Sequence, residues 1–206
     1  LADVSNQTLL ALGIKKAQKE PDAEHPYGYG RDAFVWAMIS AVGIFFLGCG
    51  FTLYHGGSAL WAHLQGHSHP IESVNVAVGV LIFSVILESW TLWVAVVEVR
   101  KSAKAADMTL QEYTQHGPDP MAVAVLLEDA AAVIGVLIAL SCIGMYLLTG
   151  NPIWDAIGSL IISALLGAVA IFLVKKNRSA LLGRTVTQRE HDAVTQVLKS
   201  DPAVEQ

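Results

Sequence analysis

Five acidic residues lie within long apolar stretches of this sequence, and no lysine or arginine shares those stretches with them. They are Asp3, Glu88, Glu128, Asp129 and, nearer the end of its stretch, Asp155. An ionised carboxylate in an apolar environment is costly unless it is paired, protonated or bound to a cation. Because these stretches contain no basic partner, protonation and cation binding are the two remaining states. A carboxylate that alternates between them exchanges protons for metal ions, so these residues predict a cation pathway.

Several of these acids also have a plainer interpretation. Glu88 could be a protonated group in helix packing, or a proton-coupling or gating group. Glu128 and Asp129 are adjacent and point about 100° apart on a helix. We therefore expect one of them to serve packing or gating. Asp3 and Asn6 are three residues apart on one helix face and could together offer two oxygen ligands.

Histidines provide a second class of ligand. His63, His67 and His69 lie in a short connection without basic residues, and imidazoles at such spacing can bind zinc. A hydrophilic loop with incidental histidines is the plainer interpretation. His55 stands alone in an apolar stretch, and we expect it to be a hydrogen-bonded structural residue.

The composition places these residues in a membrane protein. Of the 206 residues, 53% are hydrophobic and 15% are charged, and the mean hydropathy is +0.49. Soluble domains carry roughly 25% charged residues, so a soluble globule, a disordered chain and a collagen-like fibre are excluded. The net charge of −5 argues against a nucleic-acid partner. A polytopic protein in the lipid bilayer remains.

Stretches with few or no charges predict five membrane-spanning helices of the length that a bilayer requires. They run up to residue 14 and lie within 33–62, 73–97, 121–148 and 153–174. The first is expected to begin upstream of Leu1. All 13 lysines and arginines fall in alternate connections or after the last span. The positive-inside rule demands this alternation of five helices in series.

Two local patterns predict how these helices begin and pack. Thr109 with Glu112 forms a capping-box pattern, which predicts a short helix at the membrane interface. Ser159, Ser163 and Gly167 recur every four positions in the last span. Such a stripe of small residues predicts close helix packing in lipid.

Four segments, in order and spacing, resemble the cation diffusion facilitator family. They are residues 1–7 (Leu-Ala-Asp-Val-Ser-Asn-Gln), 22–31 (Asp-Ala-Glu-His-Pro-Tyr-Gly-Tyr-Gly-Arg), 126–135 (Leu-Leu-Glu-Asp-Ala-Ala-Ala-Val-Ile-Gly) and 181–184 (Leu-Leu-Gly-Arg). Within the family they are most similar to the branch of the ninth mammalian zinc transporter and its bacterial relatives. The resemblance covers essentially the whole chain.

This resemblance implies an all-α polytopic membrane protein and not an enzyme. Residues 1–176 would hold the family's second to sixth membrane helices, and residues 177–206 would start a soluble α+β domain. The family works as a homodimer that exchanges zinc for protons, so the implied partners are lipid, a divalent cation, protons and a second copy or a larger membrane assembly. The similar eukaryotic branch implies a mitochondrial membrane, with a bacterial inner membrane as the alternative.

The resemblance also implies a transport site. The family uses two acidic or histidine residues four apart on each of two helices, and Asp3 and Asp129 match the second member of each pair. The position four before Asp129 is Val125, which cannot bind metal. Either Glu128 substitutes or the site keeps water, and an oxygen-rich site would also accept Mn²⁺. The absent ligand motivates an alternative function, a non-transporting structural membrane subunit built on the same fold.

A secondary loop site is implied as well. Bacterial members bind metal in the loop that corresponds to residues 22–31, and a similar site here would use Asp22 and His25. Its third position is Tyr29, where those members have histidine. The alternative is a turn in which hydrogen bonds hold Asp22 and His25.

Overall fold

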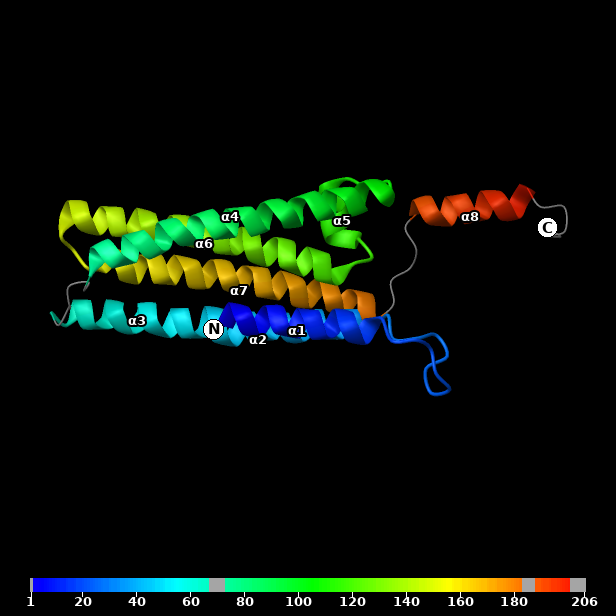
Figure 1. Cartoon of the computed structure of the whole chain (residues 1–206), viewed down its shortest axis with the longest axis horizontal. Coiled ribbons are helices and arrows are strands. Elements are labelled where there is room, and N and C mark those ends of the chain that lie inside the picture. Colours follow the sequence, from blue (N-terminus) through cyan, green and yellow to red (C-terminus); the bar gives the residue numbers. More distant parts are fainter. Residues whose placement is uncertain (1, 67–72, 183–187, 201–206) are drawn as a thin grey trace.

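In the computed structural model, which describes residues 2–66, 73–182 and 188–200, helices run side by side along one long bundle (Figure 1). In chain order the helices are α1 Ala2–Ala17, α2 Asp32–Gly43, the π-helix η1 Ile44–Gly50, α3 Phe51–Leu64, α4 Val74–Ala105, α5 Leu110–His116, α6 Pro120–Thr149, α7 Ile153–Leu181 and α8 Gln188–Ser200. Helix α8 lies beyond the end of the bundle (Figure 1). The described residues contain no strand. The predicted all-helical membrane fold is confirmed, whereas the α+β domain is not shown by this part of the chain.

Four helical segments are long and apolar enough to cross a membrane. They are Asp32–Leu64, Val74–Ala105, Pro120–Thr149 and Ile153–Ser179. They match four of the five predicted spans. Helix α1 has 16 residues, which is about 24 Å at 1.5 Å per residue and shorter than the hydrocarbon layer. It is not among the four, so the fifth predicted span is not shown.

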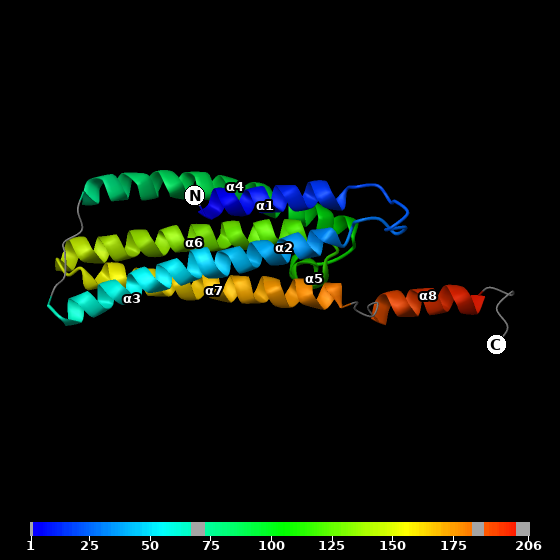
Figure 2. The ribbon, with the colours of Figure 1, turned by 90° about the horizontal axis from the view of Figure 1, so that it is seen from below.

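The order of packing leaves α1 and α4 apart. Helix α4 packs along α6, α6 along α7, α7 along α2 and α3, and α1 along α2. Figure 1 shows α4 and α1 on opposite edges, and Figure 2 shows that both lie on the same side of α6 and α7. A buried apolar cluster joins α1, α2, α6 and α7. Its members are Leu10, Ala37, Ala41, Met121, Ala124 and Leu173.

The predicted stripe of small residues is confirmed as a packing surface. Helix α7 lies along α3 and η1, and Ser163 is 2% exposed. A Cβ atom added to Gly167 would lie 3.1 Å from the Cys49 Sγ of η1. A Cβ added to Gly56 of α3 would lie 2.9 Å from the Cβ of Ser159. Only glycine allows the helices to approach this closely.

Two side chains cap the helices that follow α4. The Thr109 hydroxyl accepts a hydrogen bond from the Glu112 N–H at 3.2 Å, which confirms the predicted start of α5. Tyr113 of this short helix is 2% exposed and packs against α4 and α6. Asp119 accepts from two backbone N–H groups in the first turn of α6, at 3.0 and 3.1 Å. Proline follows it at the first helical position, where it is well tolerated.

Helices α1, α4 and α7 end at one end of the bundle, which we call the basic end (Figures 1 and 2). Lysines and arginines gather there, at the ends of these helices. Helices α3 and α6 end at the opposite end, where Gly150 closes α6 with φ +66°. This arrangement is the one predicted from the alternating charges. His67 and His69 lie outside the described residues.

Candidate functional site

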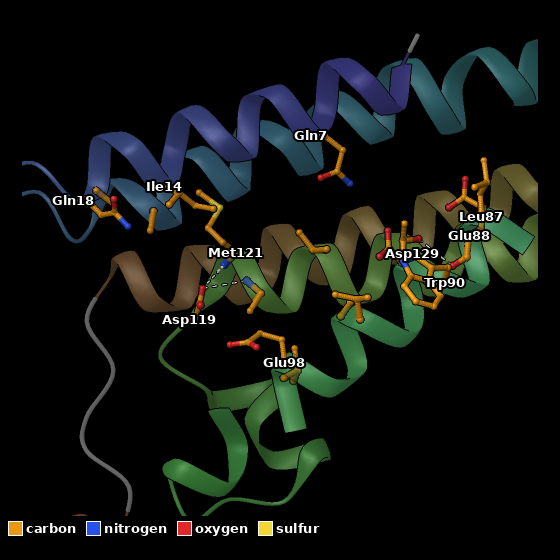
Figure 3. A pocket seen from close by; sticks show the side chains of 18 residues that line it. Gln7, Ile14, Gln18, Leu87, Glu88, Trp90, Glu98, Asp119, Met121 and Asp129 are labelled. Carbon is orange, nitrogen blue, oxygen red and sulfur yellow. Dashed lines mark hydrogen bonds between the residues drawn. The ribbon is translucent and has the colours of Figure 1, made fainter. Parts of the chain in front are cut away.

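An acid-lined cavity of about 820 Å³ lies where α1 and α4 stand apart, with α6 as its floor (Figure 3). Glu88 and Glu98 line it from α4, Asp119 and Asp129 from α6 and its cap, and Gln7 from α1. None of the described lining residues is a lysine or an arginine. Figure 3 shows Glu88 and Asp129 together toward one end of the cavity and Asp119 toward the other.

Asp129 has a buried side chain, unlike the other predicted ligands whose side chains the structure describes. It is 7% exposed, and the apolar residues around it on α6 fix its direction because they pack against α2, α4 and α7. Val125 lies one turn earlier and lines the same cavity. The cavity-facing side of α6 therefore offers one carboxylate and no second ligand one turn before it.

Glu128 faces a different helix. Its carboxylate accepts a hydrogen bond from the Ser40 hydroxyl of α2 at 3.1 Å, and Ser40 is fully buried. The predicted divergence of Glu128 and Asp129 is thus confirmed. In this conformation the Glu128 carboxylate links α6 to α2 through Ser40, and the Asp129 side chain lines the cavity.

Glu88 brings a carboxylate from a third helix. It lies on α4 at the same end of the cavity as Asp129 (Figure 3). The first turn of α1 also lies toward that end. The side chains of Asp3 and Asn6 in that turn are outside the described part of the chain. Gln7, four residues after Asp3, lines the cavity.

Three lining residues were not foreseen as site residues. Glu98 falls just beyond the predicted span 73–97, although α4 continues to Ala105. Gln7 follows Asp3 by four positions, and this helical spacing could have identified it. Asp119 precedes a proline, a pattern typical of the start of a helix and not of a cavity residue.

The loop that contains Asp22 and His25 forms a turn held by hydrogen bonds. One oxygen of Asp22 accepts from the Tyr29 hydroxyl at 2.7 Å and from Lys19 at 2.9 Å. The other accepts from the backbone N–H groups of Glu24 and His25 at 3.1 and 2.8 Å. The Tyr29 hydroxyl, followed by Lys19, holds the pKa of Asp22 well below its usual range. Both Asp22 oxygens are thus engaged, and metal binding by Asp22 and His25 stays a prediction.

At the end opposite to the basic end, His55 of α3 lies near α7. Its Nε2 is 3.9 Å from an oxygen of Asp155, in the first turn of α7. The cap of that helix comes from Asn151, whose side chain accepts from the Ile153 N–H at 3.0 Å. Within the described ranges, no three His, Cys, Asp or Glu side chains gather closely enough to hold a metal ion.

The fold and the cavity together define a polytopic helical membrane protein with carboxylates inside its spanning bundle. Residues 1–182 match the cation efflux transmembrane domain. The chain therefore belongs to the cation efflux family, a family of transporters, and the predicted family is confirmed.

Relatives of the expected branch align over the whole chain. The mitochondrial proton-coupled zinc antiporter SLC30A9 of Xenopus laevis is 45% identical over 99% of this chain, and that of Homo sapiens is 44% identical over 99%. Metal tolerance protein C4 of Arabidopsis thaliana is 43% identical over 100%. The chain spans 36%, 35% and 44% of these three relatives, less than half of their length.

Proposed function

We propose that this chain forms the membrane-spanning part of a proton-coupled zinc antiporter. The observation that carries this proposal is the buried Asp129 carboxylate, which shares with Glu88 a cavity that no described lysine or arginine lines. Carboxylates in such a cavity require protons or cations as partners. The relatives named as proton-coupled zinc antiporters support zinc as the transported ion.

Asp129 and Asp3 are the proposed primary ligands. Asp3 precedes Gln7 by one helical turn, and Gln7 lines the cavity opposite α6. Two residues four apart share a helix face, and this spacing supports a place for Asp3 on the cavity side of α1. Asn6 could add an amide oxygen. An ion held between α1 and α6 would be bound by one side of the cavity and by its floor.

Proton coupling follows from competition for the same oxygens. A protonated aspartate binds metal poorly, so each zinc ion that enters releases protons from its ligands. Glu88 is the proposed proton acceptor, because it lines the same cavity as Asp129 but lies on α4, which carries none of the proposed primary ligands. When the cavity opens to the other side, protons displace the metal, which gives exchange by alternating access.

The ligands named so far are oxygens. Such a set suits Mn²⁺ as well as Zn²⁺, so manganese is a second proposed substrate. Glu128 could complete the site only after leaving Ser40, and water is the simpler fourth ligand. The alternative, a non-transporting structural subunit, is favoured by one observation, which is Val125 in the place of a ligand.

Zinc flux in proteoliposomes tests the proposal. The full-length protein is reconstituted with an imposed pH gradient, and wild-type protein should show zinc flux that follows the gradient. Asp129→Asn should abolish this flux, whereas Glu112→Gln, an exposed carboxylate on α5, should leave it unchanged. Zinc flux that persists in Asp129→Asn would remove Asp129 from the site. Wild-type protein without zinc or manganese flux would favour the structural subunit.

The assembly and location are proposed from the same relatives. We place the protein in a mitochondrial membrane, as the names of the SLC30A9 relatives state for those proteins, with a bacterial inner membrane as the alternative. A homodimer is proposed, with residues 177–206 starting a soluble α+β domain. Helix α7 continues across residue 177 to Leu181. The first residues of this domain would therefore extend the last span as a helix.

A further inference from the structure

A second cavity, of about 500 Å³, opens at the basic end between α5, α6 and α7. We call it the α5 groove. Its inner wall is apolar and contains Leu127 of α6 with Ala168 and Phe172 of α7. Its outer rim is polar and contains the amide side chains Gln111 and Gln115 of α5. A volume of this size is typical of small-molecule sites, which span roughly 300–1,000 Å³.

The polar rim exists because of how α5 is held. Tyr113 anchors α5 by packing against α4 and α6. Gln111 and Gln115 flank Tyr113 in sequence, two residues before and after it. Residues two apart on a helix point in different directions, so these amides do not share the anchored face. The anchored helix therefore covers one side of the groove, opposite the apolar wall that the spanning helices form.

Two lysines of α7 follow the groove-lining Phe172 toward the basic end, although they do not themselves line the cavity. Lys175 and Lys176 follow Phe172 by three and four positions and share its side of α7. Lys175 is exposed. The Lys176 Nζ is buried and has no hydrogen-bond partner among the described residues. Asp119, which acts on Lys176 electrostatically, already accepts two hydrogen bonds as the cap of α6.

We propose that the α5 groove binds one anionic phospholipid. The acyl chain lies along Leu127, Ala168 and Phe172. The headgroup phosphate lies by the exposed Lys175 and the glutamine amides, and its charge also attracts the buried Lys176 ammonium across a longer distance. A phospholipid matches this order of apolar wall, amide rim and cations along the membrane normal. The charge complementarity selects an anionic headgroup over a zwitterionic one, because basic residues at a membrane surface attract anionic lipid. The inference concerns a different cavity from the acid-lined one and does not rest on zinc transport.

Lipid binding by the full-length protein tests whether the groove selects an anionic headgroup. The purified protein is titrated with phosphatidylglycerol or phosphatidylcholine of identical acyl chains, and bound lipid is counted by native mass spectrometry. Wild-type protein should retain one phosphatidylglycerol in preference to phosphatidylcholine. Each lysine is expected to contribute about fivefold in affinity. The double variant Lys175→Gln, Lys176→Gln should therefore bind phosphatidylglycerol roughly 25-fold more weakly.

A matched variant separates this site from general attraction to the basic end. Lys101→Gln with Lys104→Gln removes two exposed positive charges from α4 at the same end, and binding should change less than twofold. Equal retention of the two lipids, or equal losses in the two double variants, would overturn the proposal.

Position is tested by a phosphatidylglycerol that carries a photoreactive acyl chain. Cross-links should map to the peptides that contain Leu127 and Phe172. The exposed face of α4 around Trp93 serves as the control, because it is apolar but lacks a cationic rim. Cross-links that are as frequent at Trp93 as in the groove would contradict a specific site. If a bifunctional reagent links two protein chains at the groove while the lipid gives no cross-links there, a second copy occupies it.

Discussion

At the scale of single residues, the surroundings decide what an aspartate does. Asp119 and Asp22 each accept backbone hydrogen bonds, which hold a helix start and a turn in place. Asp129 instead lies 7% exposed beside a cavity, with Glu88 close to it. The first two are structural because their hydrogen bonds to backbone N–H groups hold a helix start and a turn. Asp129 is the proposed ligand because its cavity leaves room for a cation.

The loop turn provides a pH prediction. The pKa of Asp22 lies well below the usual 3.8, first because Tyr29 donates to it and then because Lys19 does. A lowered carboxylate pKa stabilises the folded turn fully above pH 3.8, and this stabilisation is lost as pH falls through the lowered pKa. Tyr29→Phe should raise the Asp22 pKa toward 3.8, as measured by carboxyl-carbon NMR titration. Tyr27→Phe, at a residue whose ring is fully exposed, should leave it unchanged.

Val125 provides a prediction about metal selectivity. It lines the cavity one turn before Asp129, so a histidine there would add a nitrogen ligand to an oxygen-rich site. Imidazole favours zinc over manganese. Val125→His should therefore raise the ratio of zinc to manganese flux, by about tenfold if the nitrogen contributes ~1.4 kcal/mol. Val125→Ile should leave the ratio as it is, and a ratio unchanged by histidine would place this position outside the metal site.

Part of the cavity could be predicted from the sequence. Asp129 and Glu88 are conspicuous because they are charges in apolar stretches, and a charge in lipid demands an explanation. Gln7 is uncharged, and Glu98 lies where α4 becomes polar, so neither stands out by type. Their place in the cavity depends on which helices stand apart, and a single sequence does not contain that information. The turn at Asp22 could be foreseen only as one of two alternatives.

At the scale of the elements, hydropathy locates the membrane and not the helix ends. Four spans were predicted to within a few residues of their helical cores, but α4 and α7 continue to Ala105 and Leu181. Charged residues end a membrane span, yet lysine and arginine are good helix formers, so the helices continue into water. The π-helical turns of η1, Ile44–Gly50, change no hydropathy and were not predicted.

Helix packing gives a prediction with an adjacent control. A Cβ at Gly56 would lie 2.9 Å from the Cβ of Ser159 and 3.1 Å from a backbone oxygen of α7, whereas a Cβ at Gly57 would meet nothing within 4 Å. Gly57→Ala should stabilise α3 by up to about 1 kcal/mol through helix propensity. Gly56→Ala should lose about 1–3 kcal/mol to overpacking, which outweighs that gain. Thermal unfolding in detergent measures both, and equal shifts would refute the close contact between α3 and α7.

At the scale of the whole molecule, charge and apolar surface give the bundle its orientation. Helices α1, α4 and α7 end at the basic end, and helices α3 and α6 end at the opposite end (Figure 2). Large apolar side chains such as Phe46, Leu148 and Trp90 remain exposed on the sides of the bundle. In a membrane these sides face lipid. The two ends then face different compartments, and the positive-inside rule assigns the basic end to the side from which the protein inserts.

Cysteine labelling from each side of the membrane tests this orientation. Tyr27 is fully exposed in a connection at the basic end, and Gln65 is exposed just after α3 at the opposite end. In a background in which Cys49 and Cys142 are alanine, an impermeant maleimide added to intact bacterial spheroplasts should label Gln65→Cys. It should label Tyr27→Cys only after lysis, because that end faces the inside. Since a single span, Asp32–Leu64, separates the two positions, labelling of both from one side would mean that this helix does not cross the membrane.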